Sequence, residues 1–153
     1  VLDAGAVAAP GPPGQTMDRA VISSMRTPPG PVNLLRVENV EALETHAEGR
    51  IGGQRFYLGS AEPGGKAVWV RFGAEDVALS VGAVARVSMR NQLRGRVQEM
   101  VPIDAGRRLY VGVDVGGQRV WSQITEDART DLGIEFETEV VCLVKAAAVR
   151  AVG

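Results

Sequence analysis

The chain has 153 residues, a formal net charge of −1 and one cysteine. This length allows one ordinary domain or two small lobes, and a hydrophobic content of 45% is enough for a packed core. The near-neutral charge argues against a general binder of polyanions. The single cysteine excludes an internal disulfide and fits a reducing compartment such as the cytoplasm. No apolar run approaches the ~18 residues of a membrane-spanning helix, so no direct membrane insertion is expected.

Three segments follow one another along the chain. Residues 1–32 are rich in Gly, Ala and Pro and are expected to form a connector. They begin at Val1, without an initiator Met or a basic leader, which indicates a fragment with no signal peptide. Residues 33–82 hold short strand-like runs separated by glycine-rich turns, and residues 83–153 repeat this pattern with longer strands. The expected strands of the middle segment cover 55–58, 67–72 and 76–80.

The last segment has the clearest periodicity. Apolar and polar residues alternate over 109–115, which predicts a half-buried strand. Gly116-Gly117 then predicts a tight turn into a second strand over 119–124, and a final strand is expected from about Glu139 to Val144.

A single short helix is predicted near 126–132. Thr125 is suited to cap its start, and Gly133 is suited to end it. Many short strands, glycine-rich turns and one brief helix are typical of small Greek-key barrels of the OB type. The sequence therefore predicts an all-β fold preceded by a Gly/Pro-rich connector.

One stretch carries an unusual group of polar side chains. Residues 88–95 (SMRNQLRG) place a hydroxyl, an amide and fixed positive charges just before a strand, and the next acidic residue is Glu99. Far downstream, Lys145 stands where the apolar strand 140–144 ends. Arg and Lys make charge-assisted hydrogen bonds, and hydroxyl groups such as that of Ser88 can rotate to donate. These groups suit a small oxyanion better than catalysis or nucleic acid.

The arrangement resembles the Mop family of molybdate-binding, TOBE-type domains. Residues 88–95 match the family opening "S-A-R-N-Q-L-x-G", residues 124–133 match its helix "I-T-x-x-S/A-x-x-x-L-G", and residues 143–146 match its closing "L-x-K-A". The matches occur in the family's order and span residues 83–150. At the helix, Ala128 stands where many family members carry Ser.

The resemblance implies an oxyanion site shared by two chains. Ser88 and Arg90 of one chain would face Thr125 and Lys145 of its partner, with molybdate or tungstate between them, and Asn91 is also expected to bind the oxyanion. It thus implies a homodimer that binds an oxyanion without direct ligation of a metal ion by the protein and without catalytic residues.

Weaker resemblances cover the rest of the chain. Residues 1–13 resemble the end of an ABC-transporter ATPase domain, and residues 33–35 and 70–77 resemble the accessory barrel that follows such domains. This order is that of the ATP-binding subunits of molybdate ABC importers. It implies residues 1–32 as ATPase tail and linker, 33–82 as accessory lobe and 83–153 as oxyanion-binding barrel.

That resemblance also implies a location and a role. The chain would be a regulatory part that feeds back on transport, cytoplasmic and peripheral to the cell membrane, joined to the membrane subunits through an ATPase domain outside this sequence. The Walker A, signature and Walker B motifs are absent from the sequence, so this chain is not expected to hydrolyse ATP.

Other interpretations remain open at this point. One is a free-standing molybdate-storage protein with the same barrels. A nucleic-acid-binding OB barrel needs a basic groove and stacking aromatics, and only 5% of the residues are aromatic. No nucleophile–base set indicates an enzyme. Arg90, Arg94 and Arg96 also fit a solvated strand edge, and Cys142 fits a buried small hydrophobic residue.

Overall fold

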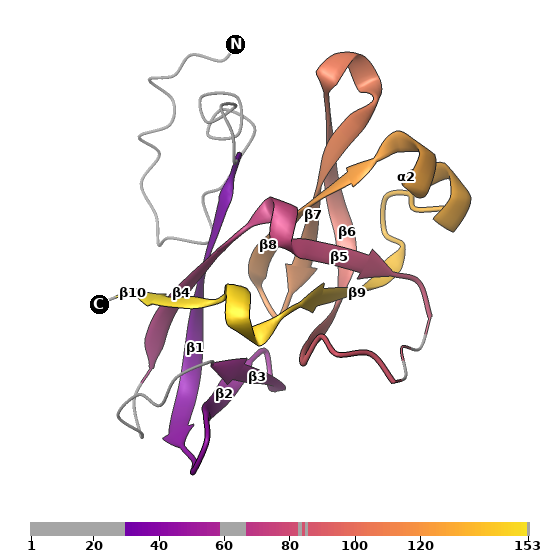
Figure 1. The fold of residues 1–153 in the computed structure, drawn as a ribbon. Helices are drawn as coiled ribbons and strands as arrows, with labels where there is room; N and C mark the ends of the chain where they lie inside the picture. Colours follow the sequence, from indigo (N-terminus) through magenta and orange to yellow (C-terminus); the bar gives the residue numbers. More distant parts are fainter. Residues whose placement is uncertain (1–29, 59–66, 83, 85, 153) are drawn as a thin grey trace.

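The computed structural model describes residues 30–58, 67–82, 84 and 86–152 of the chain, so most of the expected tail and linker lies outside the described residues. Ten strands in this part form two five-stranded sheets (Figure 1). The first sheet has the order β10-β4-β1-β2-β3, with β1 (Val32–Ala42), β2 (Ala47–Ile51), β3 (Gln54–Leu58), β4 (Val68–Gly73) and β10 (Arg150–Val152). The second has the order β5-β9-β6-β7-β8, with β5 (Val77–Ser80), β6 (Asn91–Ile103), β7 (Arg108–Val115), β8 (Gln118–Thr125) and β9 (Glu139–Val144).

Helical structure in the described residues is limited to short pieces. The α-helix α2 spans Glu126–Leu132, and the 3₁₀ helices are η2 (Ala74–Asp76), η3 (Asp104–Gly106) and η4 (Ala146–Ala148). Thr125 caps α2 by accepting a hydrogen bond from the Ala128 N–H at 3.0 Å, and Gly133 ends it in the left-handed conformation. The predicted fold class and helix are therefore confirmed. Among the described helices, none has the length and apolar character needed to cross a membrane.

Each sheet curls because its longest strand changes partners. β1 pairs with β4 through Val37 and with β2 from Glu38 onward. β6 pairs with β9 through Arg96 and with β7 from Arg96 onward. The register of both long strands shifts just after the change, and such a bulge bends a strand and increases its twist. The result is two OB-type half-barrels.

The chain exchanges one strand between the half-barrels. β5 precedes the boundary expected after residue 82, yet it pairs with β9 in the second sheet. β10 ends the chain and pairs with β4 in the first sheet, on the side of the molecule opposite α2 in Figure 1. Buried side chains from both sheets consequently form one continuous core, which includes Leu35, Phe56, Leu93, Val113 and Cys142.

The two halves are related by an internal repeat. β5 follows β4 in the chain and pairs with β9, with Val77 opposite Val144. β10 follows β9 and pairs with β4, with Arg150 opposite Arg71. The last strand of each half therefore pairs with the strand that comes just before the last strand of the other half. The hairpin turns of the two halves meet directly, because a Cβ built on Gly52 would lie 2.7 Å from the Gly116 Cα.

Two buried asparagines hold the halves together. The Asn33 amide binds the backbone of Trp121, which donates from its N–H at 2.6 Å and accepts at its carbonyl at 2.9 Å. The Asn91 amide makes the same pair of bonds to Tyr57, at 2.6 Å and 3.1 Å. β3 and β8 are sheet edges, so these bonds satisfy backbone groups that would otherwise lack partners.

Candidate functional site

Three of the predicted site residues lie at one corner of the second sheet. Asn91 and Val144 form the last pair of the β6–β9 ladder, so Arg90 and Lys145 are the next residues on the two neighbouring strands. Both side chains are exposed, as is Ser88 two residues before Arg90. We call Ser88, Arg90 and Lys145 the cationic corner. Its two cations come from the same chain and are brought together by strand register.

Among the residues that the structure describes, no carboxylate neutralises the charges of this corner. Within the described residues, neither Arg90 nor Lys145 has an ion pair with a carboxylate. Arg96, further along β6, does form an ion pair, because its guanidinium lies 3.3 Å from the Glu139 carboxylate. Two uncompensated cations beside a hydroxyl form a suitable place for an anion with several oxygen atoms.

Asn91 has a different position from its cationic neighbours. It is fully buried, and its amide oxygen and nitrogen both bond the Tyr57 backbone. Asn91 therefore holds the start of β6 against β3 and does not present its side chain at the surface.

Tyr57 extends the corner onto the first sheet. The Arg90 guanidinium lies over the Tyr57 ring, 4.7 Å from its centroid, and the Arg55 guanidinium donates to the Tyr57 hydroxyl at 3.0 Å. Hydrogen bonding to Arg90 first, and to Arg55 second, lowers the pKa of Tyr57 below its ordinary value. The sequence motif pointed to Arg90 but not to Arg55 and Tyr57, which only the folding of β3 against β6 brings to it.

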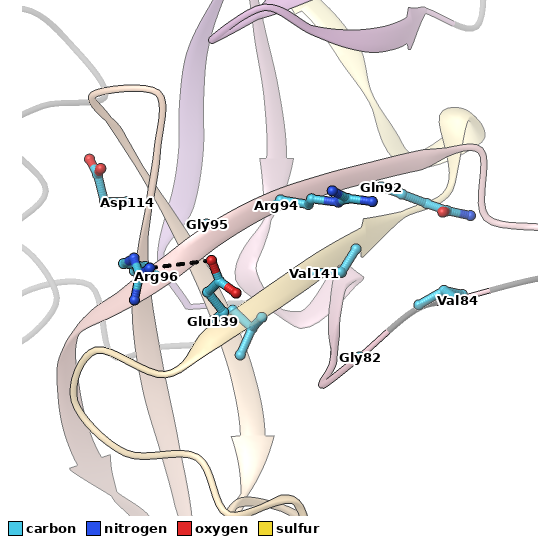
Figure 2. Close-up of a pocket in the computed structure, with 10 residues that line it drawn as sticks. Gly82, Val84, Gln92, Arg94, Gly95, Arg96, Asp114, Glu139 and Val141 are labelled. Atoms are coloured by element: carbon cyan, nitrogen blue, oxygen red, sulfur yellow. Dashed lines mark hydrogen bonds and ion pairs between the residues drawn. The ribbon is translucent and has the colours of Figure 1, made fainter.

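A shallow groove runs along β6 and β9, and Ser88, Arg90 and Lys145 are not among the residues that line it. It has a volume of about 620 Å³. In Figure 2, Gln92 and Arg94 lie along β6 on the side where Val141 projects from β9, and Gly82 and Val84 face them from the loop after β5. β6 pairs with β9 up to Arg96 and with β7 only from Arg96 onward, so Arg94 lies on a stretch of β6 that has a neighbouring strand on one side only.

Thr125 lies far from the cationic corner of its own chain. It pairs with Arg108, which in turn pairs with Ile103 at the far end of β6. The strand between Asn91 and Ile103 spans roughly 40 Å at ordinary strand rise. Next to Thr125, Glu126 is ion-paired with Arg129 at 2.7 Å, which lowers the pKa of Glu126. Strand register thus places Thr125 at the opposite end of the second sheet from the cationic corner of its own chain.

The internal repeat gives the cationic corner a counterpart at the other half. Val32 pairs with Gly73 at the end of the β1–β4 ladder, in the positions that correspond to Arg90 and Lys145. Gly30 corresponds to Ser88, and a Cβ built on it would lie 2.8 Å from the Tyr110 hydroxyl. This counterpart corner thus has no charged side chain at the three positions and is closed by an aromatic residue.

Comparisons with known proteins agree with the sequence resemblance. Residues 87–151 match the family model "TOBE domain". The molybdenum import ATP-binding protein ModC of Yersinia pseudotuberculosis serotype I (strain IP32953) is 29% identical over 138 residues, which cover 88% of this chain and 38% of that protein. The ModC protein of Pectobacterium atrosepticum is 32% identical over 99 residues, or 64% of this chain and 28% of that protein. The chain therefore spans less than two fifths of the length of these curated relatives.

A solved structure shows the same fold. The cytoplasmic molybdate-binding protein ModG, in a crystal form with molybdate bound, superposes with a TM-score of 0.65 at 23% sequence identity. The match covers 78% of this chain and 94% of the ModG chain. The paired half-barrels of the present chain thus correspond to nearly the whole of that protein.

Proposed function

We propose that the chain, whose residues 87–151 match the TOBE domain family model, binds molybdate, or the similar tungstate, at its cationic corner. The observation that carries the proposal is the position of Arg90 and Lys145 at neighbouring strand ends, without carboxylate partners in the described residues. Ser88 adds a hydroxyl donor, and Asn91 supports the corner from beneath by binding Tyr57. The related ModC and ModG proteins are named for molybdenum import and molybdate binding.

The direct test is a titration with four anions. Isothermal titration calorimetry with molybdate, tungstate, sulfate and phosphate should give similar affinities for molybdate and tungstate, because these two ions have nearly the same size and charge. Sulfate and phosphate should bind more weakly. Equal binding of all four anions, or no binding of molybdate, would contradict the proposal.

We propose further that a second copy of the chain completes each site. Thr125 lies at the opposite end of the second sheet from the cationic corner of its own chain, and it is exposed. In a homodimer, Ser88, Arg90 and Lys145 of one chain would face Thr125 of the partner. Ala128 has no side-chain hydroxyl, so Thr125 would be the principal side-chain donor of that second chain.

Mixing variants tests the origin of each side chain. An equimolar mixture of Arg90→Ala and Thr125→Ala chains should recover one intact site per mixed dimer. A mixture of Arg90→Ala and Lys145→Ala chains should recover none, since both cations belong to the same chain. Recovery in the second mixture would show that the two cations come from different chains. A strictly monomeric protein that binds molybdate tightly would exclude a shared site.

We propose that this chain is the regulatory C-terminal part of a molybdate ABC importer ATP-binding subunit. The match to ModC leaves only about an eighth of the chain uncovered, so it reaches into residues 1–29, which resemble an ATPase tail. Hydrolysis of ATP would belong to a separate domain that contacts the membrane subunits, with the whole assembly on the cytoplasmic side of the membrane. Bound oxyanion would favour one arrangement of the paired ATPase domains by its differential affinity.

Feedback on transport is the expected consequence. A coupling free energy of ~1–3 kcal/mol, typical of such effects, changes an affinity roughly 5- to 150-fold. The ATPase activity of an intact importer carrying this region should fall as molybdate rises, and Lys145→Ala should relieve the inhibition. Equal inhibition of both proteins would show that this corner is not the regulator.

The alternative is a free-standing molybdate-binding protein. The observation in its favour is that the match covers 94% of ModG, so the described fold is nearly sufficient to make up that protein. Mass spectrometry of the natural gene product decides between the two, because an importer subunit would carry an ATPase domain before residue 1.

A further inference from the structure

The ring of Tyr57 is held in place from several directions. The Arg55 guanidinium donates to its hydroxyl at 3.0 Å, and the His46 ring lies 5.2 Å from the Tyr57 ring, tilted by 31°. The Tyr57 backbone donates to the Asn91 amide oxygen at 2.6 Å and accepts from the amide nitrogen at 3.1 Å. The position of the ring relative to β6 is therefore well defined.

Arg90 uses this ring as a platform. Its guanidinium carbon lies 4.7 Å from the ring centroid, inside the range of about 6 Å for a cation–π contact. Arg90 directly precedes Asn91, so consecutive residues of the second sheet contact the side chain and the backbone of Tyr57 in the first. A guanidinium over a ring keeps the in-plane N–H groups that do not bond the phenol available for an anion.

Holding the guanidinium in place before binding has an energetic consequence. A free arginine side chain samples many rotamers and loses that freedom when it binds a ligand. Restricting it in advance lowers this entropic cost and strengthens binding without a new contact to the ligand.

The counterpart half provides an internal comparison. The hairpin Gly116–Trp121 repeats the pattern of Gly52–Tyr57, and Arg119 lies 5.7 Å from the Trp121 ring centroid as Arg55 lies 5.8 Å from that of Tyr57. At Trp121, however, the position that corresponds to Arg90 is Val32. Both hairpins therefore have a contact between an arginine and the aromatic ring two residues later. Of these two rings, the Tyr57 ring also contacts an arginine from the opposite sheet, Arg90.

We infer that Tyr57 is a positioning residue, which holds Arg90 in the orientation that receives the oxyanion, so that each binding corner is built from both sheets of one chain. This inference rests on the proposed function. Nothing in the motif of residues 88–95 or in the Lys145 segment includes Tyr57.

A double-mutant cycle tests the coupling. Calorimetry with molybdate is carried out on the full chain and on its Tyr57→Leu, Arg90→Ala and doubly substituted variants. We expect Tyr57→Leu to weaken binding roughly two- to fivefold, the size of an exposed cation–π contact. In the Arg90→Ala background the same substitution should cause no further loss. An equal loss in both backgrounds, or no loss in the wild-type background, would overturn the inference.

A ligand-free measurement separates this inference from the proposed function. Ultraviolet titration of tyrosinate absorbance follows the two tyrosines, and Tyr57→Phe identifies the contribution of Tyr57. Arg90→Ala should raise the pKa of Tyr57 towards its ordinary value, because it removes the largest cause of the depression. If molybdate does not bind the wild-type protein, the proposed function fails, and an unchanged Tyr57 titration would then overturn the positioning role as well.

Arg119→Ala is the matched control for the corner. It removes the corresponding guanidinium of the other hairpin, and both the molybdate affinity and the Tyr57 titration should stay unchanged. Arg55→Ala should instead raise the pKa of Tyr57, because it removes the hydrogen bond to the phenol. If Arg119→Ala reproduced the effects of Tyr57→Leu, the effect would be a general loss of structure and the inference would be wrong.

Discussion

Gln54 and Gln118 make equivalent pairs of hydrogen bonds between the two sheets. Gln54 belongs to the first sheet and binds the second, and Gln118 belongs to the second sheet and binds the first. The Gln54 amide accepts from the Arg94 N–H at 2.8 Å and donates to the Arg94 carbonyl at 3.0 Å. The Gln118 amide binds the backbone of Arg36 in the same way, at 2.8 Å and 2.9 Å. At Arg36, β1 has a paired strand on one side only, and the same is true of β6 at Arg94. Each glutamine therefore satisfies a strand edge that the curvature of the other half-barrel leaves open.

Removing the buried asparagines should destabilise the fold more than removing these glutamines. Asn33→Ala leaves the N–H and carbonyl of Trp121 buried without partners, and each such group costs ~1–3 kcal/mol. We expect a decrease of roughly 2–5 kcal/mol in the free energy of unfolding for Asn33→Ala, and a similar decrease for Asn91→Ala. Gln54→Ala should cost less, because its bonds are exposed and water can replace them.

Urea denaturation of the three variants measures this difference. If Asn33→Ala were no more destabilising than Gln54→Ala, the asparagine bonds would not be what joins the sheets.

The close contact between the two hairpin turns predicts a difference between neighbouring glycines. A Cβ on Gly116 would lie 2.4 Å from the Gly52 Cα, whereas a Cβ on Gly117 would meet nothing within 4 Å. Both residues have positive φ, so an alanine at either position carries a similar backbone strain of ~1–2 kcal/mol. Gly116→Ala should therefore lower the melting temperature clearly more than Gly117→Ala. Equal losses would show that only the backbone conformation matters at the turn.

Neutralising the cationic corner should weaken oxyanion binding in a defined order. Arg90→Ala and Lys145→Ala each remove a charge-assisted contact worth ~1.5–3 kcal/mol, which is roughly a 10- to 150-fold loss of affinity. Ser88→Ala removes a neutral hydrogen bond and should cost ~0.5–1.5 kcal/mol. Arg107→Ala is the control, since Arg107 is paired with Asp104 at η3. Calorimetry in which Arg107→Ala weakened binding as much as Arg90→Ala would indicate only a general effect of net charge.

The internal repeat predicts one bound oxyanion per chain rather than two. The counterpart corner carries Gly30, Val32 and Gly73 where the cationic corner carries Ser88, Arg90 and Lys145. Without charge-assisted donors, nothing offsets the free-energy cost of removing a dianion from water. Equilibrium dialysis at saturating molybdate should give one ion per chain, and Lys145→Ala should reduce this value. A stoichiometry of two that persisted in Lys145→Ala would place a site at the other half.

The buried thiol should be unreactive in the native protein. Cys142 is fully buried, and burial raises the pKa of its thiol to about 12. A thiol reagent at pH 8 should therefore label the unfolded chain and not the folded one, since the thiolate is the reactive form. Between the ordinary thiol pKa and the raised pKa, the Cys142 thiol loses its proton in the unfolded chain but keeps it in the folded one. The free energy of unfolding should therefore fall as the pH rises towards 12. Cys142→Ala should lack that part of the decrease.

Local sequence determined the elements whose signals lie within a few residues. Alternation over 109–115, the Gly116-Gly117 turn, and the Thr125 and Gly133 caps are short-range features, and β7, β8 and α2 follow them closely. The residues of the cationic corner were singled out through their resemblance to the Mop motifs, which are short stretches that can be read without a structure.

Only the tertiary structure decided how distant segments meet. The exchange of β5 and β10 between sheets, the use of Asn91 on the Tyr57 backbone and the position of Tyr57 beneath Arg90 all join residues more than 30 positions apart. Such pairings depend on which strand edges remain open after each half-barrel curls, and no local propensity encodes that. For the same reason the sequence analysis expected Arg90 and Lys145 to come from different chains, whereas strand register puts them side by side in one chain and leaves Thr125 at the opposite end of the sheet.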